Sequence, residues 1–220
     1  MSKLTITMRI TLDTAVHTTG NLRRPGVDKA MARAPNGTLA LPATTLKGFL
    51  REKAEILLRA WGHRVCVGPE PKRLCKGPEL CLVCRVFGSP RRPSPLHFSD
   101  GHLITEETNP SVRAGVAISR HRRAAFPQRL FFVETTTLSS TQWHARCEGY
   151  FPSPNAAEEA AALIALAARW GIAIGGGRTR GLGWIRQIEV EARVDDQLIS
   201  EVRMRALWQA WQEGKHVAED

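Results

Sequence analysis

The sequence predicts an α+β fold, because segments with the period of a strand alternate with segments that have the period of a helix. In residues 4–12, every second residue is Leu, Ile or Met, and threonine or arginine lies between them. This alternation is typical of a strand with one buried face. Residues 44–61 and 156–170 instead carry apolar side chains at helical spacing, and glycine follows each of them.

Both helices have residues that favour a defined start. Thr44 precedes the first apolar stripe, and we expect its hydroxyl to cap the first turn. Asn155 and Glu158 resemble a capping box at the start of the second helix.

The remaining elements are shorter. Residues 112–119 and 129–138 are strand-like and could pair as a long hairpin. Residues 143–150 and 184–194 also have the pattern of strands, and 196–213 form an expected C-terminal helix that contains tryptophan.

The resulting core order is β-α-β-β-α-β, with a large insertion after the first helix. This is the ferredoxin-like order, which RNA-recognition domains share. The aromatic pattern of an ordinary RNA-recognition motif is not found, so we expect a modified core with insertions.

Charge indicates a polyanionic partner. Lysine and arginine outnumber aspartate and glutamate by 31 to 21, which gives a net charge of +10. Such an imbalance favours nucleic acid, although a generally basic protein is the alternative. The arginines gather in expected loops around 91–92, 120–123 and 178–180, and this clustering favours binding.

Nothing in the sequence predicts a membrane partner. No run of eighteen apolar residues occurs, and the first residues alternate like a strand instead of forming a signal peptide. We therefore expect a cytoplasmic protein.

Four cysteines have the spacing of a metal site: Cys66, Cys75, Cys81 and Cys84. Four thiolates within nineteen residues can close a tetrahedral zinc site that is structural, because a full ligand set leaves no open position. Unligated thiols and a redox pair at Cys81 and Cys84 are the alternatives, and His63 is a substitute ligand. The fifth cysteine, Cys147, is expected to be a small buried residue.

A glycine-rich run covers residues 175–183 and contains Arg178 and Arg180. Glycines let a backbone approach a ligand closely and present its N–H groups, and arginine adds forked donors for phosphate. The sequence lacks the Gly-Lys-Ser/Thr of a P-loop. We interpret the run as a clamp for an RNA backbone, with Gly176, Gly177 and Gly181 at its centre; a mobile turn is the alternative.

Two cations lie in the first turns of the first expected helix. Lys47 and Arg51 oppose the helix dipole there, which makes sense if an anion docks at the helix start. Two solvated cations are the alternative.

Asp28 is a carboxylate in a loop that otherwise carries Arg23, Arg24, Lys29 and Arg33. It could serve as a general base toward a 2′-hydroxyl or as a ligand for a divalent cation. An aspartate that stabilises a turn is the more frequent explanation of such a residue.

These pieces, in this order, resemble the RAMP superfamily of CRISPR-associated proteins, above all the backbone subunit of type III effector complexes. The stretch from Asn36 to Arg51, with Leu46-Lys47-Gly48, is similar to the most diagnostic motif of that family. Further similar segments are His17-Thr18-Thr19-Gly20, Gly26-Val27-Asp28, Cys84-Arg85-Val86-Phe87-Gly88, Arg113 to Arg120, Leu130-Phe131 with Glu134, and the run from Gly175 to Gly183. Ala43-Thr44-Thr45, His121-Arg122-Arg123 and the C-terminal helix depart from its pattern.

The resemblance implies one RAMP domain over 1–194, with a zinc-binding insertion at 63–95 and a thumb hairpin at 105–132. The C-terminal helix expected from the sequence pattern, at 195–220, lies outside this domain. It implies that the chain holds guide RNA beside further copies or similar subunits in a filament. Besides the clamp residues, the implied RNA-binding residues are His17, Lys47, Arg51, Arg113, Arg120, Arg122 and Arg123.

The same resemblance implies that Asp28 cleaves complementary target RNA with a divalent cation such as Mg²⁺ or Mn²⁺. Three other functions stay open. The chain could be a non-cleaving RAMP subunit, a guide-processing endoribonuclease with His17 as its base, or a zinc-stapled assembly protein without enzymatic activity.

Overall fold

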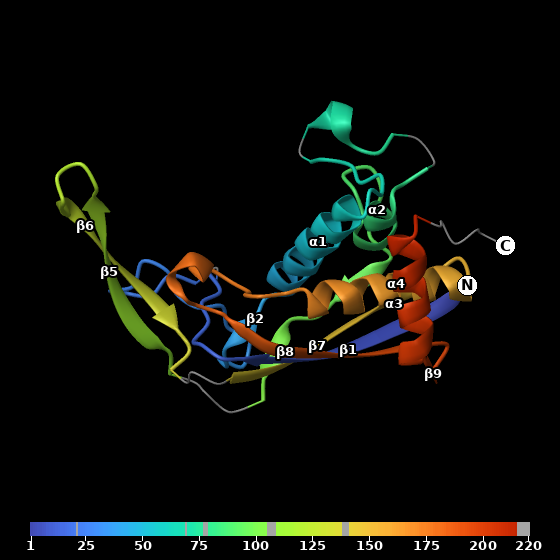
Figure 1. The fold of residues 1–220 in the computed structure, drawn as a ribbon. Coiled ribbons are helices and arrows are strands. Elements are labelled where there is room, and N and C mark those ends of the chain that lie inside the picture. Colours follow the sequence, from blue (N-terminus) through green and yellow to red (C-terminus); the bar gives the residue numbers. More distant parts are fainter. Residues whose placement is uncertain (21, 69, 77–78, 105–108, 138–140, 215–220) are drawn as a thin grey trace.

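A computed structural model describes residues 1–20, 22–68, 70–76, 79–104, 109–137 and 141–214. It has an α+β architecture, as predicted, with an antiparallel sheet covered by helices on one face and a hairpin that projects from one end (Figure 1). Parts of several predicted segments lie outside the described residues: positions 69 and 77–78 of the 63–95 insertion, the start of the 105–132 hairpin, the end of the 129–138 strand and the last residues of the chain.

The central strand of the sheet is β1, Ser2–Leu12, which pairs with β7 on one side and β8 on the other. Its alternate residues are fully or nearly fully buried, which confirms the half-buried strand. The sheet order is β2-β4-β7-β1-β8-β9, and β3 pairs with β7 beside β4. The other strands are β2 Ala40–Leu41, β3 Leu96–Phe98, β4 Gly101–Leu103, β7 Thr141–Phe151, β8 Ile185–Val194 and β9 Gln197–Leu198.

The two core helices are α1, Ala43–Ala60, and α3, Pro154–Arg169. They pack against each other on the same face of the sheet, and α3 contacts β1, β7 and β8 (Figure 1). Ten residues of α3 are buried, most of them alanine, because small side chains let the helix lie close to both the sheet and α1. The short elements are α2 Leu82–Phe87, η1 Pro71–Arg73 and η2 Arg178–Arg180.

The predicted helix caps are wrong, and tertiary contacts explain why. Thr44 lies inside α1, whose first N–H, on Ala43, donates to Oδ1 of Asp100 at 2.7 Å. A carboxylate from a distant loop thus caps the helix. At α3 the cap is Ser153, whose hydroxyl accepts from the Ala156 N–H at 3.2 Å. Pro154 sets this earlier start, because its fixed φ suits the first helical position.

The C-terminal segment begins differently from the prediction. Instead of a helix from residue 196, the chain turns at Asp195 and Asp196, forms β9 and enters helix α4, Glu201–Gln212. Two contacts hold α4 on α3: the Trp208 indole donates to the Ala162 carbonyl at 2.8 Å, and Arg203 pairs with Glu158 at 2.7 Å.

The projecting hairpin consists of β5, Ser111–Ser119, and β6, Ala124–Thr135. Its second strand starts earlier than the predicted residue 129, because a register shift between Val116 and Ile118 lets pairing resume at the tip. No helix in the described part of the chain is long and apolar enough to cross a membrane.

Candidate RNA-binding surface and metal centre

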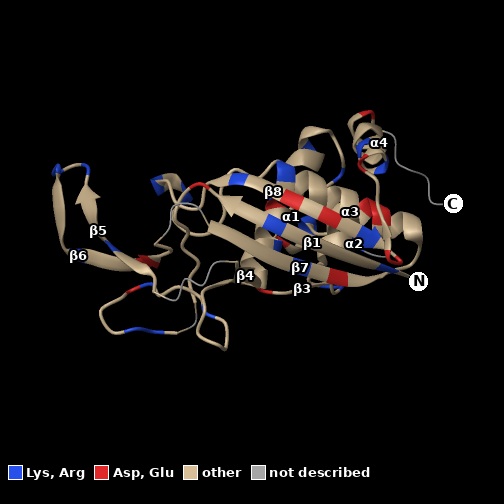
Figure 2. Cartoon of the chain, turned by 90° about the horizontal axis from the view of Figure 1, so that it is seen from below, with Lys and Arg blue, Asp and Glu red and all other residues tan. Residues whose placement is uncertain are grey.

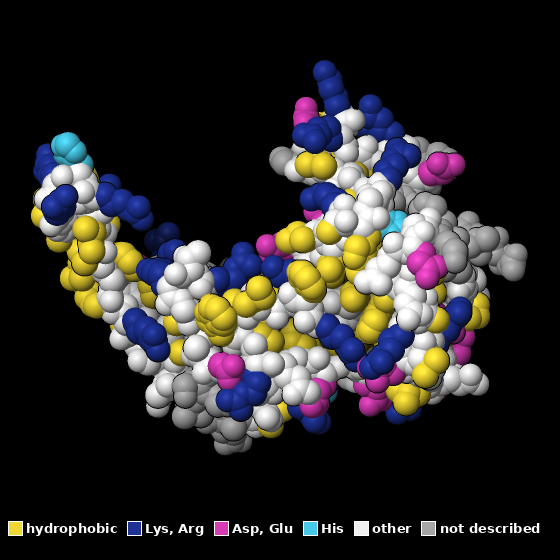
Figure 3. Space-filling view, viewed as in Figure 1, with side chains coloured by type: hydrophobic (Ala, Val, Ile, Leu, Met, Phe, Trp, Pro, Cys, Tyr) yellow, Lys and Arg dark blue, Asp and Glu magenta, His cyan; other side chains and the backbone are white. Residues whose placement is uncertain are grey.

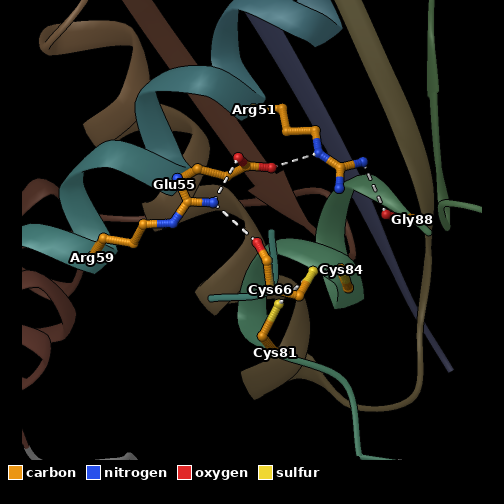
Figure 4. Close-up of polar contacts among 7 residues, drawn as sticks. All are labelled: Arg51, Glu55, Arg59, Cys66, Cys81, Cys84 and Gly88. Carbon is orange, nitrogen blue, oxygen red and sulfur yellow. Dashed lines mark hydrogen bonds and ion pairs between the residues drawn. The ribbon is translucent and has the colours of Figure 1, made fainter. Parts of the chain in front are cut away.

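The four predicted metal ligands come together at the far end of α1. The Sγ atoms of Cys66, Cys75, Cys81 and Cys84 all lie within 4.8 Å of one another, with Cys66 and Cys84 only 3.3 Å apart (Figure 4). Zinc–sulfur bonds of about 2.3 Å would place tetrahedral sulfurs about 3.8 Å apart. The four thiols therefore fit a metal ion such as zinc.

Electrostatics in this cluster favour a bound cation. Burial, a hydrogen bond with the Cys66 sulfur and the neighbouring Cys81 raise the pKa of Cys84 well above its usual range. Burial would also raise the pKa of Cys81, but hydrogen bonds with backbone groups of Cys66 and Cys84 outweigh burial and lower it. The raised pKa of Cys84 opposes its deprotonation in the absence of a cation, and a metal ion would stabilise the thiolate form.

Two further expectations concerned His63 and Cys147. His63 does not join the cluster: its Nε2 donates to the Trp211 carbonyl at 2.7 Å and so contacts α4. Cys147 is buried in β7, as expected, and burial raises its pKa to about 12.

At the opposite end of α1, the base of the hairpin meets the first loop of the chain. Glu134 at the end of β6 is 1% exposed, and its carboxylate binds Arg24 at 2.6 Å and the Met31 N–H at 2.8 Å. Its backbone carbonyl contacts Nδ1 of His17 at 2.6 Å. Thr136 adds two further hydrogen bonds with the backbone of Val16.

His17 is buried and uses both ring nitrogens. Nδ1 donates to the Glu134 carbonyl, which leaves Nε2 to accept from the Thr19 hydroxyl at 2.9 Å. Burial is the main cause of a lowered pKa, so the ring is neutral near pH 7. The ring thus positions the first loop on the hairpin base.

The glycine-rich loop packs against this same first loop. The Gly176 N–H donates to the His17 carbonyl at 2.8 Å. A β-carbon on Gly175 would lie 2.4 Å from that carbonyl, and one on Gly183 would lie 1.9 Å from the Ile174 carbonyl. Both glycines also have positive φ, so only glycine allows this close approach.

The side chains of Arg178 and Arg180 extend from the loop in different directions. Arg178 pairs with Glu52 on α1 at 3.2 Å, and its side chain stays 44% exposed. Arg180 lies over the Phe131 ring of β6 at 5.5 Å. The loop therefore links α1 to the base of the hairpin. Gly177 and Gly181 flank the turn that carries both arginines.

A groove crosses the start of α1 between the glycine-rich loop and the first loop. One hollow, of about 380 Å³, is lined by Gly175, Gly176 and Arg178 together with Thr19, Thr44 and Thr45. The same three threonines also line a second hollow, which extends toward Arg33 and Asp100. The hydroxyls of Thr44 and Thr45 can act as neutral donors on the α1 side of the groove, whereas the Gly176 N–H and the Thr19 hydroxyl are bound to His17.

The two predicted cations of α1, Lys47 and Arg51, are not among the residues that line these two hollows. Lys47 is half-buried with its ammonium 5.7 Å from the centre of the Phe98 ring, and burial followed by the nearby Arg51 lowers its pKa. Arg51 turns toward the cysteine segment, where it donates to Glu55 at 2.9 Å and to the Gly88 carbonyl at 3.1 Å (Figure 4).

Asp28 lies exposed beside the base of the hairpin. Its Oδ2 accepts from the Phe132 N–H at 2.7 Å, and its own N–H donates to the Phe132 carbonyl at 3.0 Å. Within the described part of the chain, Oδ1 has no hydrogen-bond or ion-pair partner. The carboxylate is thus oriented through one oxygen and open at the other.

The arginine side chains of the hairpin are exposed to solvent. Arg113 is on β5, while Arg120, Arg122 and Arg123 lie at the tip, and all four are exposed (Figure 3). None of the four has an ion-pair partner among the residues that the structure describes. The hairpin is therefore an electropositive arm.

The open face of the sheet has the opposite character. Arg9 pairs with Glu189 at 3.1 Å, Arg146 with Glu148 at 2.8 Å and Arg193 with Glu191 at 2.9 Å. Figure 2 shows these strands from below, with basic and acidic residues interleaved along them. RNA-recognition domains bind RNA on their open sheet face. Here that face is neutralised, whereas the exposed arginines at the hairpin tip have no acidic partner among the residues that the structure describes.

The comparison with known families agrees with this geometry. The model of the RAMP superfamily matches residues 9–186, which include the first loop, α1, the hairpin and the glycine-rich loop. The chain belongs to the RAMP superfamily. This membership indicates a CRISPR-associated RNA-binding subunit. No curated protein matches this RAMP chain.

Sequence reasoning missed three residues that shape the site of this RAMP protein. Glu134 was matched only as part of the hairpin, and Glu52 and Asp100 were not singled out at all. An isolated glutamate or aspartate carries no local signal of its partner. For Glu134, an acidic residue at the end of an apolar strand was the one available hint.

The ion pair of Arg24 and Glu134 leads to an asymmetric prediction. Arg24→Ala leaves a buried carboxylate without its cation, and we expect it to lower the free energy of unfolding by about 3 kcal/mol. Glu134→Gln leaves a cation that is half exposed and can regain water, so we expect a loss of about 1–2 kcal/mol. Urea unfolding of both variants measures the difference, and a larger loss for Glu134→Gln would contradict this account.

Proposed function

We propose that this chain is an RNA-binding subunit of a type III CRISPR effector complex, which holds guide RNA and cleaves complementary target RNA. The observation that carries the proposal is the groove across the start of α1, with the exposed carboxylate of Asp28 near one end and a basic hairpin beside it. Membership of the RAMP superfamily supports the same proposal.

The groove has the chemistry of a backbone-binding track. Hydroxyl and backbone N–H donors recognise phosphate and sugar oxygens without reading the base, so base pairing is left to supply sequence. Arg178 lines the groove and stays 44% exposed, so it can offer a forked donor to a phosphate. Lys47 and Arg51 are proposed as further RNA contacts on α1, although neither lines the groove.

The hairpin is proposed to act as the thumb. Its exposed arginines, among them Arg113, Arg120, Arg122 and Arg123, would contact the phosphates of guide and target, and its length would let it enter the space between paired segments. In a filament each copy would place its thumb against RNA held by further copies or similar subunits.

Asp28 is proposed to promote cleavage. Its bound oxygen fixes the orientation of the carboxylate, and its open oxygen can take the proton of a 2′-hydroxyl. The 2′-oxygen would then attack the adjacent phosphate, and the bond to the 5′-oxygen of the next nucleotide would break. A divalent cation such as Mg²⁺ or Mn²⁺ would stabilise charge on the phosphate oxygens.

The remaining assignments follow from the same proposal. The core is a ferredoxin-like RAMP domain over 1–194 with a zinc-binding insertion at 63–95 and a C-terminal helix after it. The protein works in the cytoplasm within a ribonucleoprotein.

A non-cleaving RAMP subunit is the second candidate function. It is favoured by the two hydrogen bonds between Asp28 and Phe132, which give the aspartate a structural task of its own. The role of His17 as a general base has less support, because both of its ring nitrogens are engaged.

Zinc in the cysteine cluster is the first testable part. Elemental analysis of the purified chain should give about one zinc ion per chain, the number that one four-thiolate site holds. Cys81→Ser should lose the metal and lower thermal stability, whereas Cys147→Ser, which alters a cysteine outside the cluster, should keep the metal. Full metal content in Cys81→Ser would argue against the site.

RNA binding in the groove is tested with Arg178→Ala combined with Arg180→Ala. We expect weaker binding of RNA of any sequence, and a shallower dependence on salt by about 0.7 in log–log slope for each lost phosphate contact. Glu52→Gln is the control, because it removes only the partner of Arg178 and should not weaken binding. Equal losses in both variants would mean that the Arg178–Glu52 pair is merely structural.

Cleavage is tested with Asp28→Asn in the assembled, guide-loaded complex. Asparagine keeps the acceptor oxygen for the Phe132 N–H but cannot take a proton, so the cleavage rate should fall at least ~10²-fold while guide binding and assembly remain. Cleavage at the wild-type rate would leave the non-cleaving subunit as the better description of the chain.

A further inference from the structure

The segment that carries the four cysteines stands opposite the hairpin. We call residues 63–68, 70–76 and 79–87 the cysteine lobe. The lobe follows α1 directly and lies at its far end, so that the lobe and the hairpin rise on either side of a concave surface (Figures 1 and 3). The groove lies at the other end of α1.

The outer surface of the lobe is basic and largely unpaired. Arg64, Lys72, Arg73 and Lys76 are all exposed there. Within the described residues, Arg73 has one carboxylate contact, with Glu70 at 3.7 Å, and the other three have no ion-pair partner. The side chains of the η1 turn point outward, since none of its residues is buried.

Cations elsewhere in the protein differ in whether they have an ion-pair partner. On the open sheet face, three arginines each have a carboxylate partner within 3.1 Å. On the hairpin, the tip arginines have no such partner among the described residues. The lobe thus resembles the hairpin in carrying cations without close acidic partners, and the two rise on either side of the concave surface (Figure 3). An unpaired basic surface is the electrostatic footprint of a polyanion.

We infer that the cysteine lobe is a second RNA-contacting arm, which binds phosphates of the strand that leaves the groove. The inference rests on the proposed function and extends it to a part of the chain outside the groove and hairpin. The four-cysteine site would then support RNA binding, because a metal held there would fix the turn that carries Lys72, Arg73 and Lys76.

The distance between groove and lobe sets the length of RNA that is needed. The helix between them has 18 residues, so at about 1.5 Å per residue it is about 27 Å long. A stacked strand rises about 3.4 Å per nucleotide, so about eight nucleotides separate the two sites. A short RNA can fill the groove without reaching the lobe.

The test uses the purified full-length chain with its metal, and single-stranded RNAs of about six and about sixteen nucleotides. We expect the combination Lys72→Ala, Arg73→Ala and Lys76→Ala to weaken binding of the long RNA and to lower its salt slope by up to about 2, since each lost phosphate contact removes about 0.7. Binding of the short RNA should stay unchanged, and so should the metal content.

The matched control is the combination Arg9→Ala, Arg146→Ala and Arg193→Ala, which removes the same charge from the open sheet face. It should leave the salt slope of the long RNA unchanged. An equal fall in slope for both combinations would mean that the lobe acts only through net charge, and the inference would be wrong.

Other results also separate the explanations. If the lobe variant keeps the salt slope of the long RNA, or if it loses its metal, then Lys72, Arg73 and Lys76 act only to stabilise the thiolates. Unchanged RNA binding with failed assembly of the complex would show that the lobe docks on an acidic protein surface. A wild-type chain that binds neither RNA would overturn the proposed function itself.

Discussion

The buried carboxylate of Glu134 is the constraint on which the candidate site depends. A charge in the interior must be paired and hydrogen-bonded, or it destabilises the fold. Glu134 meets this requirement with Arg24 and the Met31 N–H, which lie on either side of Asp28 in the chain. Its backbone carbonyl also holds the His17 ring. One residue thus fixes the first loop, the Asp28 segment and the hairpin base in a single arrangement.

The hairpin extends from this junction without support from the main sheet. A two-stranded hairpin is marginally stable alone, and this one exposes apolar side chains such as Ile118 and Leu130. Its anchored base therefore determines where the arm points, while its outer part remains open to a partner. Arg180 strengthens the base from the other side, because it stacks on Phe131 and ties the hairpin to the glycine-rich loop.

Local patterns in the sequence predicted the periodic elements well, because burial on one face dictates period in both strands and helices. The cysteine cluster was predictable for a similar reason: four ligands within nineteen residues can converge through local turns alone. The helix caps were not predictable. Asp100 reaches α1 from 57 positions away, and Glu134 meets Arg24 from 110 positions away. Such pairs depend on sheet register and on the path of loops, which no single segment encodes.

The positions of the charged residues say more about function than the net charge does. A net charge of +10 would suit many basic proteins, but the structure divides the cations into two classes. Those on the sheet face are neutralised by acidic neighbours, so that face projects little field. The arginines at the hairpin tip, and Arg64, Lys72 and Lys76 on the cysteine lobe, lack such neighbours among the described residues, so their charge is not neutralised. A polyanion approaching this protein would therefore be drawn toward the groove, with backbone donors and the Asp28 carboxylate already oriented to receive it.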